Sequence, residues 1–432
     1  MNVHDSEKLA GQLEGRGYVR AASAAEADVV LLNTCSIREK AAEKVFSELG
    51  RLRELKVAKP NLVLGVCGCV AQQEGGAIFE RAPHVDFVIG PRATGSLSGI
   101  LEHIRRDEGG ARHMVDTGYR NDSIDFPFDE IRREGQCPTK AFVTVVEGCN
   151  HRCTYCIVPT TRGREVCRPQ EVVLAEVRAL AARGFVEIEF LGQTVNAYRD
   201  SAGHGLADLL TEAAAVPGIR RIRFTTSHPA QMTEPLMDAM AAASPIVCPY
   251  LHLPVQSGSS AVLAAMKRGY DRDGYLRKID GLRRRLPDLA LGTDIIVGFP
   301  AEGDQDFEQT LSLVAGVRFD TVFSFTYSPR PGTAALALGD ALPLARKQER
   351  LARLQELQRG IQERANSAWV GRDVEVLIEG PSKRDPDRWS GRTPEDRLVH
   401  FAGATAAGRF ERVRIRRATA YALQGEPVGH FA

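Results

Sequence analysis

Runs of apolar residues in the first hundred positions alternate with stretches that have helical spacing. Helical patterns begin near Arg38 and Ala71, and the strand-like runs that separate them are 28–35, 61–69 and 85–90. Continuous apolar strands separated by helices are typical of a parallel sheet buried on both faces. The pattern therefore predicts an open α/β sheet. Cys35 and Cys69 lie at the carboxyl ends of two of these strands, where such sheets place their functional sites.

Strands and helices alternate again after a polar stretch, residues 107–134, which is typical of a linker. This stretch contains Asp-Glu-Gly-Gly and Asn-Asp-Ser, which favour turns. Six strand-like runs follow, each separated from the next by enough residues for a crossover helix: 141–146, 186–191, 221–225, 250–255, 291–297 and 321–327. Six such units predict a partial (β/α)6 barrel rather than a closed barrel of eight.

The last part of the chain has a different pattern. Leucines at helical spacing among basic residues predict an amphipathic helix over 344–361, and short alternating segments follow at 373–378, 397–401 and 411–417. Short alternating strands separated by turn residues predict a small β-barrel. We therefore divide the chain into four parts: an α/β domain (1–106), a linker (107–134), a partial barrel (135–366) and a small β-barrel (367–431).

Composition narrows the class of protein. The formal net charge is only +1, from 56 Lys and Arg against 55 Asp and Glu, so no global field attracts the chain to nucleic acid. The sequence shows no secretory leader pattern and no apolar run of about 18 residues, so we expect a cytoplasmic protein without a membrane partner. Nine cysteines in such a chain indicate metal ligation or thiolate chemistry rather than a disulfide framework.

Three cysteines stand close together directly after the strand-like run 141–146. Cys149, Cys153 and Cys156 have the spacing C-x3-C-x2-C. Three thiolates on a tight loop can each ligate one iron of a [4Fe–4S] cluster and leave the fourth iron without a protein ligand. A zinc site normally needs a second cysteine pair or histidines, and no second pair follows at the required distance. The spacing therefore favours a cluster with one open iron.

This loop resembles the cysteine motif of the radical S-adenosylmethionine superfamily. The resemblance implies that the three cysteines are the catalytic cluster ligands, that the open iron binds S-adenosylmethionine, and that Tyr155 packs near the adenine. A tyrosine buried in the loop core is the alternative for Tyr155. We expect Arg223 at the barrel mouth. Four further polar residues at predicted strand ends there are expected to contact the cofactor or else to brace loops: Gln193, Asn196, Gln256 and Asp294.

Five further stretches resemble one branch of that superfamily, the methylthiotransferases. They are Asn33–Glu39, Gly68–Gln72, Ile157–Glu165, Leu251–Ser259 and Asp294–Pro300. The resemblance implies a methylthiotransferase domain, a radical domain and an RNA-binding TRAM barrel, with two [4Fe–4S] clusters and S-adenosylmethionine as cofactors. The residues after Cys35 and Cys156 look most like the type that methylthiolates C2 of N6-isopentenyladenosine next to the anticodon of tRNA. The alternatives are methylthiotransferases for a ribosomal-protein aspartate or for threonylcarbamoyl-adenosine, and a non-catalytic iron–sulfur RNA-binding protein.

The family carries three cluster cysteines in its N-terminal domain, and the resemblance places only Cys35 and Cys69 here. The first cysteine of the family precedes a Met-Asn-x-x-Asp-Ser-Glu segment by two residues, and that segment is Met1–Glu7 in this sequence. We expect a miscalled start or a truncation, with natural loss as the alternative. Cys67, predicted on the same strand face as Cys69, is either a substitute ligand or a buried thiol. A site with two thiolates should hold its cluster poorly.

Local groups of cations are the candidates for RNA contact. Arg162 and Arg164 follow the cysteine loop, where we expect them to meet an anionic substrate, and the other candidates lie in the β-barrel segment: Lys383, Arg384, Arg392, Arg412 and Arg414. Strand edges protected by charge are the alternative for the barrel cations. The resemblance implies as partners a tRNA with an isopentenylated anticodon loop and an electron donor such as flavodoxin or ferredoxin. We expect a monomer.

Overall fold

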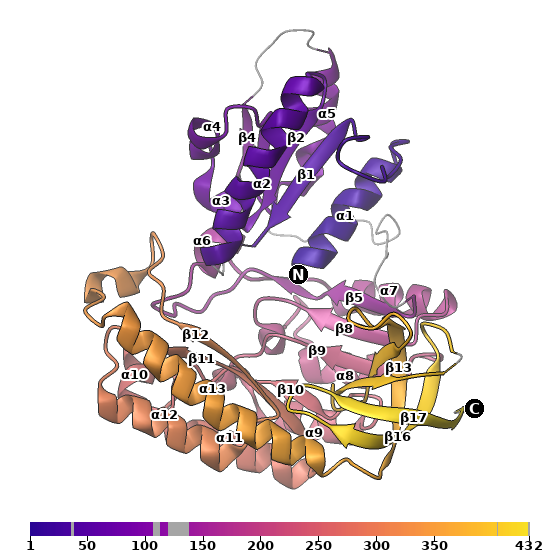
Figure 1. Ribbon diagram of the computed structural model, residues 1–432, viewed down its shortest axis with the longest axis vertical. Coiled ribbons are helices and arrows are strands. Elements are labelled where there is room, and N and C mark those ends of the chain that lie inside the picture. Colours follow the sequence, from indigo (N-terminus) through magenta and orange to yellow (C-terminus); the bar gives the residue numbers. More distant parts are fainter. Residues whose placement is uncertain (36–38, 107–112, 120–137, 404, 431–432) are drawn as a thin grey trace. The chain divides into compact units, whose positions relative to one another are not determined.

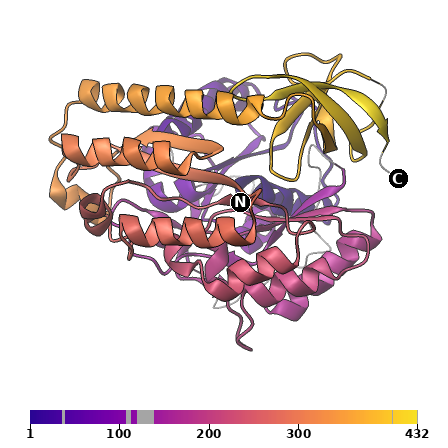
Figure 2. The same ribbon diagram turned by 90° about the horizontal axis from the view of Figure 1, so that it is seen from below.

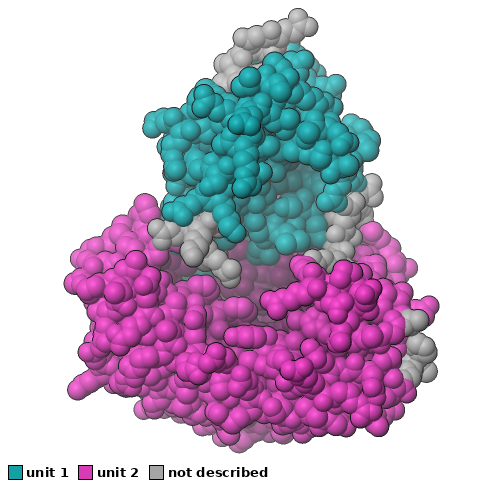
Figure 3. All heavy atoms as spheres, viewed as in Figure 1, with its two compact units in different colours: residues 1–133, 147–151, 157–166 teal, residues 134–146, 152–156, 167–432 magenta. Residues whose placement is uncertain are grey.

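The computed structural model describes the chain apart from residues 36–38, 107–112, 120–137, 404 and 431–432. The described residues form two compact units (Figure 3). Unit 1 contains residues 1–133, 147–151 and 157–166, and unit 2 contains residues 134–146, 152–156 and 167–432. The division passes through the cysteine loop, so Cys149 belongs to unit 1 whereas Cys153 and Cys156 belong to unit 2. Most of the predicted linker lies outside the described residues.

Unit 1 contains a parallel four-stranded sheet with helices on both faces (Figure 1). The strands pair in the order β1 (Val29–Thr34), β2 (Val63–Gly68), β3 (Phe87–Ile89) and β4 (Met114–Asp116). The open α/β sheet is therefore confirmed. Its fourth strand, β4, falls within the stretch predicted to be a linker, because three residues there pair with β3 although the surrounding sequence is polar.

Two apolar cores flank this sheet, because successive strand residues point to opposite faces. One face packs against α1 (Asn2–Glu14) and α5 (Leu97–Arg106). The other face packs against three helices: α2 (Glu39–Ala58), α3 (Cys69–Glu74) and α4 (Ala77–Arg81). Helix α2 begins at Glu39, close to the helical pattern expected near Arg38. This burial on both faces explains why the strands read as continuous apolar runs.

Unit 2 contains two parallel three-stranded sheets (Figures 1 and 2). The first sheet has β5 (Lys140–Thr144), β8 (Glu187–Leu191) and β9 (Arg221–Phe224), and the second has β10 (Tyr250–His252), β11 (Ala290–Val297) and β12 (Thr321–Thr326). A parallel bridge joins Ile222 of β9 to Val247, which precedes β10. The six strands coincide with the six predicted runs, so the partial barrel is confirmed.

Helices alternate with these strands, and all of them except the short helix at 260–265 share one apolar core with the strands. They are α7 (Gln170–Ala182), α8 (Leu206–Ala214), α9 (Glu234–Ala242), α10 (Ser260–Ala265), α11 (Arg272–Arg285), α12 (Asp304–Val317) and α13 (Leu344–Ser367). Figure 2 shows the long orange helix α13 leading into the yellow barrel at the end of the chain. No helix among the described residues is long and apolar enough to cross a membrane.

The chain ends in a closed five-stranded barrel, as predicted. Its strands pair in the order β13 (Asp373–Pro381), β14 (Trp389–Arg392), β15 (Leu398–Phe401), β17 (Leu423–His430) and β16 (Phe410–Ala418). Alternate residues such as Val374, Val376 and Ile378 point inward and fill the barrel core. The intervening residues point outward, and several of them are arginines and carboxylates that pair with one another.

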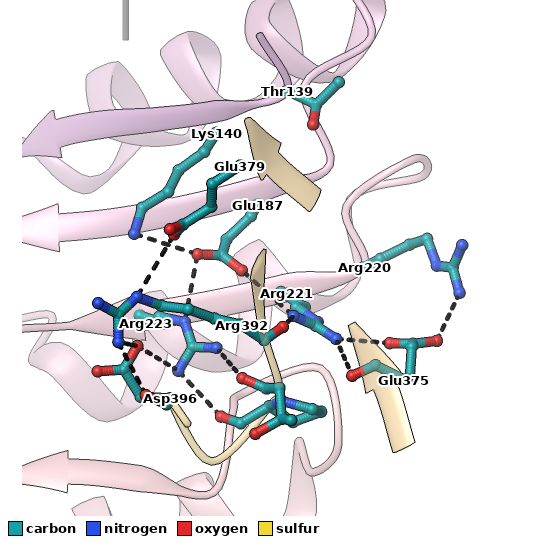
Figure 4. Close-up of polar contacts among 12 residues, drawn as sticks. Thr139, Lys140, Glu187, Arg220, Arg221, Arg223, Glu375, Glu379, Arg392 and Asp396 are labelled. Carbon is teal, nitrogen blue, oxygen red and sulfur yellow. Dashed lines mark hydrogen bonds and ion pairs between the residues drawn. The ribbon is translucent and has the colours of Figure 1, made fainter. Parts of the chain in front are cut away.

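One face of the β5-β8-β9 sheet is charged where it meets the barrel (Figure 4). Glu187 pairs with Arg223 at 3.2 Å and with Arg221 at 3.8 Å, and Arg221 also pairs with Glu375 of β13 at 2.8 Å. Arg223 donates two further hydrogen bonds to the carbonyl oxygens of residues 393 and 394. The expectation that Arg223 serves the barrel mouth is therefore wrong, because Glu187 and the loop after β14 occupy its guanidinium.

Candidate functional site

Cys35 and Cys69 come together at the carboxyl edge of the unit 1 sheet. Cys35 follows β1, and Cys69 is the first residue of α3, directly after β2. Gly68 has φ +89°, and a Cβ there would lie 2.9 Å from the Thr34 carbonyl oxygen, so only glycine permits this close approach of the two strand ends. A hydrogen bond with the Cys35 thiol and the nearby Arg162 guanidinium lower the pKa of Cys69 to about 6.

Arg162 supports this cysteine pair from inside unit 1. It is the last residue of α6 (Val158–Arg162) and is 4% exposed. Its Nε donates to Cys69 Sγ at 3.3 Å, and its Nη2 donates to Asp5 Oδ2 at 2.5 Å. Burial alone would raise the pKa of Asp5, but the guanidinium outweighs it and holds that pKa below its ordinary value. The expectation that Arg162 meets an RNA substrate is therefore wrong, because Asp5 and Cys69 bury the side chain.

The donor set beside Cys69 fits a cluster. Nη1 of Arg162 is buried and has no hydrogen-bond partner among the described residues. A buried donor without an acceptor is costly, and sulfide or thiolate sulfur of an iron–sulfur cluster would accept from it. Cys35 and Cys69 would supply thiolates on the same side. These features suit a bound [4Fe–4S] cluster at this edge of the sheet, although two thiolates should hold it less firmly than three.

Cys67 does not join the other two cysteines of unit 1. It lies in β2 and is fully buried in the apolar core with Leu9, Phe87 and Ile89. Burial raises the pKa of its thiol to about 12. The prediction that Cys67 shares a strand face with Cys69 is wrong, because β2 ends at Gly68 and Cys69 already belongs to α3. The buried thiol is the reading that the structure favours for Cys67.

The first half of the cysteine loop is braced within unit 1. Gly148 has φ +82°, and a Cβ there would collide with the carbonyl oxygen of Arg164. The N–H of Cys149 donates to the Gly163 carbonyl oxygen at 3.2 Å, and the N–H of Glu165 donates to Asn150 Oδ1 at 3.2 Å. The segment that follows the loop therefore fixes the backbone on which Cys149 stands. Arg164 itself has an exposed side chain.

The second half of the loop is braced within unit 2. Thr154 donates from its N–H and its Oγ1 to the carbonyl oxygens of residues 266 and 265, at 3.1 and 3.0 Å. The N–H of Cys156 donates to the Cys153 carbonyl oxygen at 3.0 Å, which closes the turn of the C-x2-C pair. Arg268 Nη1 donates to Cys153 Sγ at 3.3 Å. Among the described residues, no three His, Cys, Asp or Glu side chains converge as a single metal ion requires, and a four-iron cube spaces its cysteines more widely.

Tyr155 packs into a small apolar cluster with Val262, Met266, Phe299 and Tyr327. Burial raises its pKa well above the ordinary value, so the phenol stays protonated. The geometry accords with the alternative of a tyrosine in the loop core, and a contact with adenine stays a prediction.

The four residues predicted to contact the cofactor differ in their freedom to do so. Asn196 is engaged at both ends of its amide, because Nδ2 donates to the His228 carbonyl oxygen at 2.9 Å and Oδ1 accepts from the His228 N–H at 2.8 Å. It braces a loop. Asp294 pairs with His252 at 3.3 Å. Gln256 has φ +74° and exchanges backbone hydrogen bonds with β11, which holds the turn after β10 in place. Gln193 is half-buried.

The barrel cations predicted to bind RNA fall into two groups. Arg412 and Arg414 share Asp373, at 3.0 and 2.6 Å, and Arg392 lies within 3.5 Å of Glu379 and Asp396 carboxylates. These carboxylates neutralise part of the arginine stripe, which favours the alternative of a charged strand surface there. Lys383 and Arg384 are exposed in the loop after β13. Arg164 is exposed as well, and so is Arg412, although the Arg412 side chain pairs with Asp373.

Arg268 and Asp5 are functional candidates that sequence reasoning missed. Arg268 lies 115 residues from the cysteine to which it donates, and Asp5 lies 157 residues from Arg162. No spacing rule connects such distant positions. Only the fold reveals the contacts.

Comparisons with known proteins cover the whole length of the chain. Three family models match: Uncharacterized protein family UPF0004 at residues 1–90, Radical SAM superfamily at 143–314 and TRAM domain at 368–428. The chain is 48% identical to a tRNA-2-methylthio-N(6)-dimethylallyladenosine synthase of Alkalilimnicola ehrlichii and 46% identical to one of Solibacter usitatus. Each match covers 99% of this chain and 95% of the relative.

Two solved structures resemble the fold of this chain at low sequence identity. The radical S-adenosylmethionine methyltransferase TsrM from Kitasatospora setae, with cobalamin and a [4Fe–4S] cluster bound, has a TM-score of 0.58 and 16% identity, covering 77% of this chain and 73% of that chain. The cobalamin-dependent S-adenosylmethionine radical enzyme OxsB has a TM-score of 0.53 and 12% identity, covering 81% and 53%. At such identity the likeness shows the fold alone.

Proposed function

Because the chain belongs to the family of tRNA-2-methylthio-N(6)-dimethylallyladenosine synthases, we propose that its two cysteine sets hold two iron–sulfur clusters with different tasks. The protein is a radical S-adenosylmethionine transferase that methylthiolates C2 of N6-isopentenyladenosine in tRNA. The observation that carries this function is the end-to-end match at 45–48% identity with curated synthases. The matched relatives favour this activity over the ribosomal-protein and non-catalytic alternatives.

Cys149, Cys153 and Cys156 are proposed to hold the cluster that binds S-adenosylmethionine. When bound, that cluster would supply the electron for reductive cleavage of the cofactor, and its iron without a protein ligand would be left to bind the cofactor. The residues of the chain hold the cysteine loop in place and supply the proposed contacts with the cofactor. Hydrogen bonds at Cys149 and Thr154 fix the loop, and backbone hydrogen bonds with β11 fix the turn that carries Gln256, a proposed cofactor contact. Gln193 and Asp294 complete the proposed cofactor contacts.

Cys35 and Cys69 are proposed to hold the second cluster, which serves sulfur insertion. Support comes from the thiol pair at the sheet edge and from the buried Nη1 of Arg162, which needs an acceptor. The hydrogen bond with Cys35 and the Arg162 guanidinium both favour the ionised form of Cys69, which is the form that binds iron. The same cation is charge-balanced by Asp5, so the pair does not leave a lone buried charge.

The tRNA is proposed to contact the chain through Arg164 and through Lys383 and Arg384 of the TRAM barrel. Exposed cations bind phosphates, and an anticodon loop offers unstacked bases that can enter an active site. We further propose that the protein acts in the cytoplasm as a monomer and takes electrons from a donor such as flavodoxin or ferredoxin.

Anaerobic reconstitution with iron and sulfide tests the proposed function. The reconstituted chain is incubated with dithionite, S-adenosylmethionine and an isopentenylated anticodon stem-loop, and the products are identified by mass spectrometry. A methylthio mass gain on the isopentenylated adenosine is expected, with no gain on a matched stem-loop that carries unmodified adenosine. Cleavage of S-adenosylmethionine without any mass gain would contradict the transferase activity of this chain.

A further inference from the structure

Arg268 is a buried arginine that none of the sequence motifs assigns, and its side chain reaches the cysteine loop of unit 2. It lies three residues after α10 and is 5% exposed. Nη1 donates to Cys153 Sγ at 3.3 Å and to the Tyr155 hydroxyl at 3.4 Å. Nη2 donates to the Pro254 carbonyl oxygen at 2.9 Å, and Nε donates to the Tyr270 hydroxyl at 3.0 Å. Every nitrogen of the guanidinium is thus engaged.

These contacts fix the guanidinium against the sulfur. The Tyr270 hydroxyl donates in turn to the Val255 carbonyl oxygen at 2.9 Å, so the acceptor for Nε is itself held in place. The planar fork of arginine cannot turn away from Cys153 without breaking the bonds to Pro254 and Tyr270. One side chain therefore joins the cysteine loop to the turn that precedes Gln256.

We propose that Arg268 is a positioning residue that raises the reduction potential of the cluster held by the cysteine triplet, because it donates a charged hydrogen bond to the sulfur of Cys153. The inference rests on the proposed assignment of that triplet. Reduction adds negative charge to a cluster, and a cation with an N–H directed at a ligand sulfur stabilises the reduced form more than the oxidised form. Hydrogen bonds to cluster sulfurs are among the features that set such potentials.

The charge at Arg268 is balanced by no carboxylate among its hydrogen-bond partners. Tyr155, Tyr270 and Pro254 present neutral oxygens, and the one acceptor that can carry negative charge is Cys153. Burial in a medium of low dielectric strengthens the attraction between this cation and the sulfur. The field of the guanidinium therefore falls on the cluster ligand rather than on a counter-ion.

The test compares Arg268→Gln and Arg268→Lys with Lys267→Gln in a chain that also carries Cys35→Ala and Cys69→Ala, so that only the triplet can bind a cluster. Lys267 is the neighbouring cation, its side chain is exposed, and its substitution removes the same charge from the chain. Each reconstituted protein is titrated with dithionite under anaerobic conditions. The reduced cluster is followed by electron paramagnetic resonance, and iron per chain is measured in parallel.

Arg268→Gln should bind as much iron as its parent and show a more negative midpoint potential. Arg268→Lys keeps the charge but loses the planar fork, so its midpoint potential should lie between those of the parent and of Arg268→Gln. Lys267→Gln should have the same midpoint potential as the parent. An unchanged midpoint potential in Arg268→Gln with full iron would overturn the proposed role of Arg268 without affecting the assignment of the triplet. If Arg268→Gln loses iron, the iron content and midpoint potential of Arg268→Lys test the proposal. A midpoint potential below that of the parent in Arg268→Lys supports the proposal, whereas iron loss in both variants shows that Arg268 is needed to hold the cluster and overturns its proposed effect on the potential. A parent that binds no cluster would overturn the triplet assignment.

Discussion

In each of the two cysteine regions a buried arginine donates a hydrogen bond to a cysteine sulfur, but only one of the two arginines is paired with a carboxylate. In unit 1, Arg162 donates to Cys69 and is balanced by Asp5 at 2.5 Å. In unit 2, Arg268 donates to Cys153, and its other acceptors are neutral oxygens. A balanced arginine orients a ligand and stabilises the fold around it, whereas an unbalanced one also imposes its charge on the sulfur. The presence or absence of a counter-ion therefore decides whether a buried arginine acts as a structural support or as an electrostatic one.

The largest effect on stability is expected in unit 1. Asp5→Ala leaves Arg162 buried without its counter-ion, which should lower the free energy of unfolding of that unit by about 3–5 kcal/mol. The double variant Asp5→Ala/Arg162→Met removes both charges and should recover much of this loss. Urea denaturation followed by circular dichroism measures both. Equal destabilisation of the single and double variants would show that Asp5 is not the counter-ion that matters.

Acid should weaken unit 1 through the same pair. The pKa of Asp5 is held below its ordinary value of 3.8, so the stability that the carboxylate contributes is present above that value and is lost as the pH falls through the lowered pKa. The double variant Asp5→Ala/Arg162→Met lacks this carboxylate and should show a shallower fall in unfolding free energy below pH of about 4. Parallel curves for parent and double variant would contradict the assigned shift.

A smaller effect, on tRNA binding, is expected from the same contrast between exposed cations and carboxylate-paired cations on the barrel surface. Lys383→Gln/Arg384→Gln removes two exposed cations, and Arg412→Gln/Arg414→Gln removes two that share Asp373. The first variant should reduce the salt dependence of tRNA binding by about 0.7–0.9 in slope for each lost phosphate contact, and the second should change it less. Filter binding across salt concentrations measures both slopes. A larger change in the second variant would contradict the view that Asp373 neutralises the stripe.

The sequence predicts what depends on local pattern. Apolar runs revealed β1 to β3 in unit 1 and the strands of the two parallel three-stranded sheets in unit 2, and the spacing of Cys149, Cys153 and Cys156 marked the loop, because neighbouring residues in the chain create those signals. Contacts between residues that are distant in the chain could not be predicted from the sequence. The sequence indicated an exposed position for Arg162, but the fold buries its side chain beside Asp5. It indicated a position at the barrel mouth for Arg223, but the loop after β14 binds the Arg223 guanidinium. Charged side chains are hard to place from sequence because their burial depends on a partner elsewhere in the chain.

The division of tasks between the two cysteine sets is tested most directly by comparing Cys153→Ala with Cys35→Ala. Both reconstituted variants are incubated with dithionite, S-adenosylmethionine and the isopentenylated stem-loop, and 5′-deoxyadenosine and the methylthio product are quantified together by mass spectrometry. Cys153→Ala should form neither product, whereas Cys35→Ala should still cleave S-adenosylmethionine but leave the adenosine without its methylthio group. Equal residual methylthiolation in the two variants would contradict the proposal that the two sites have separate roles.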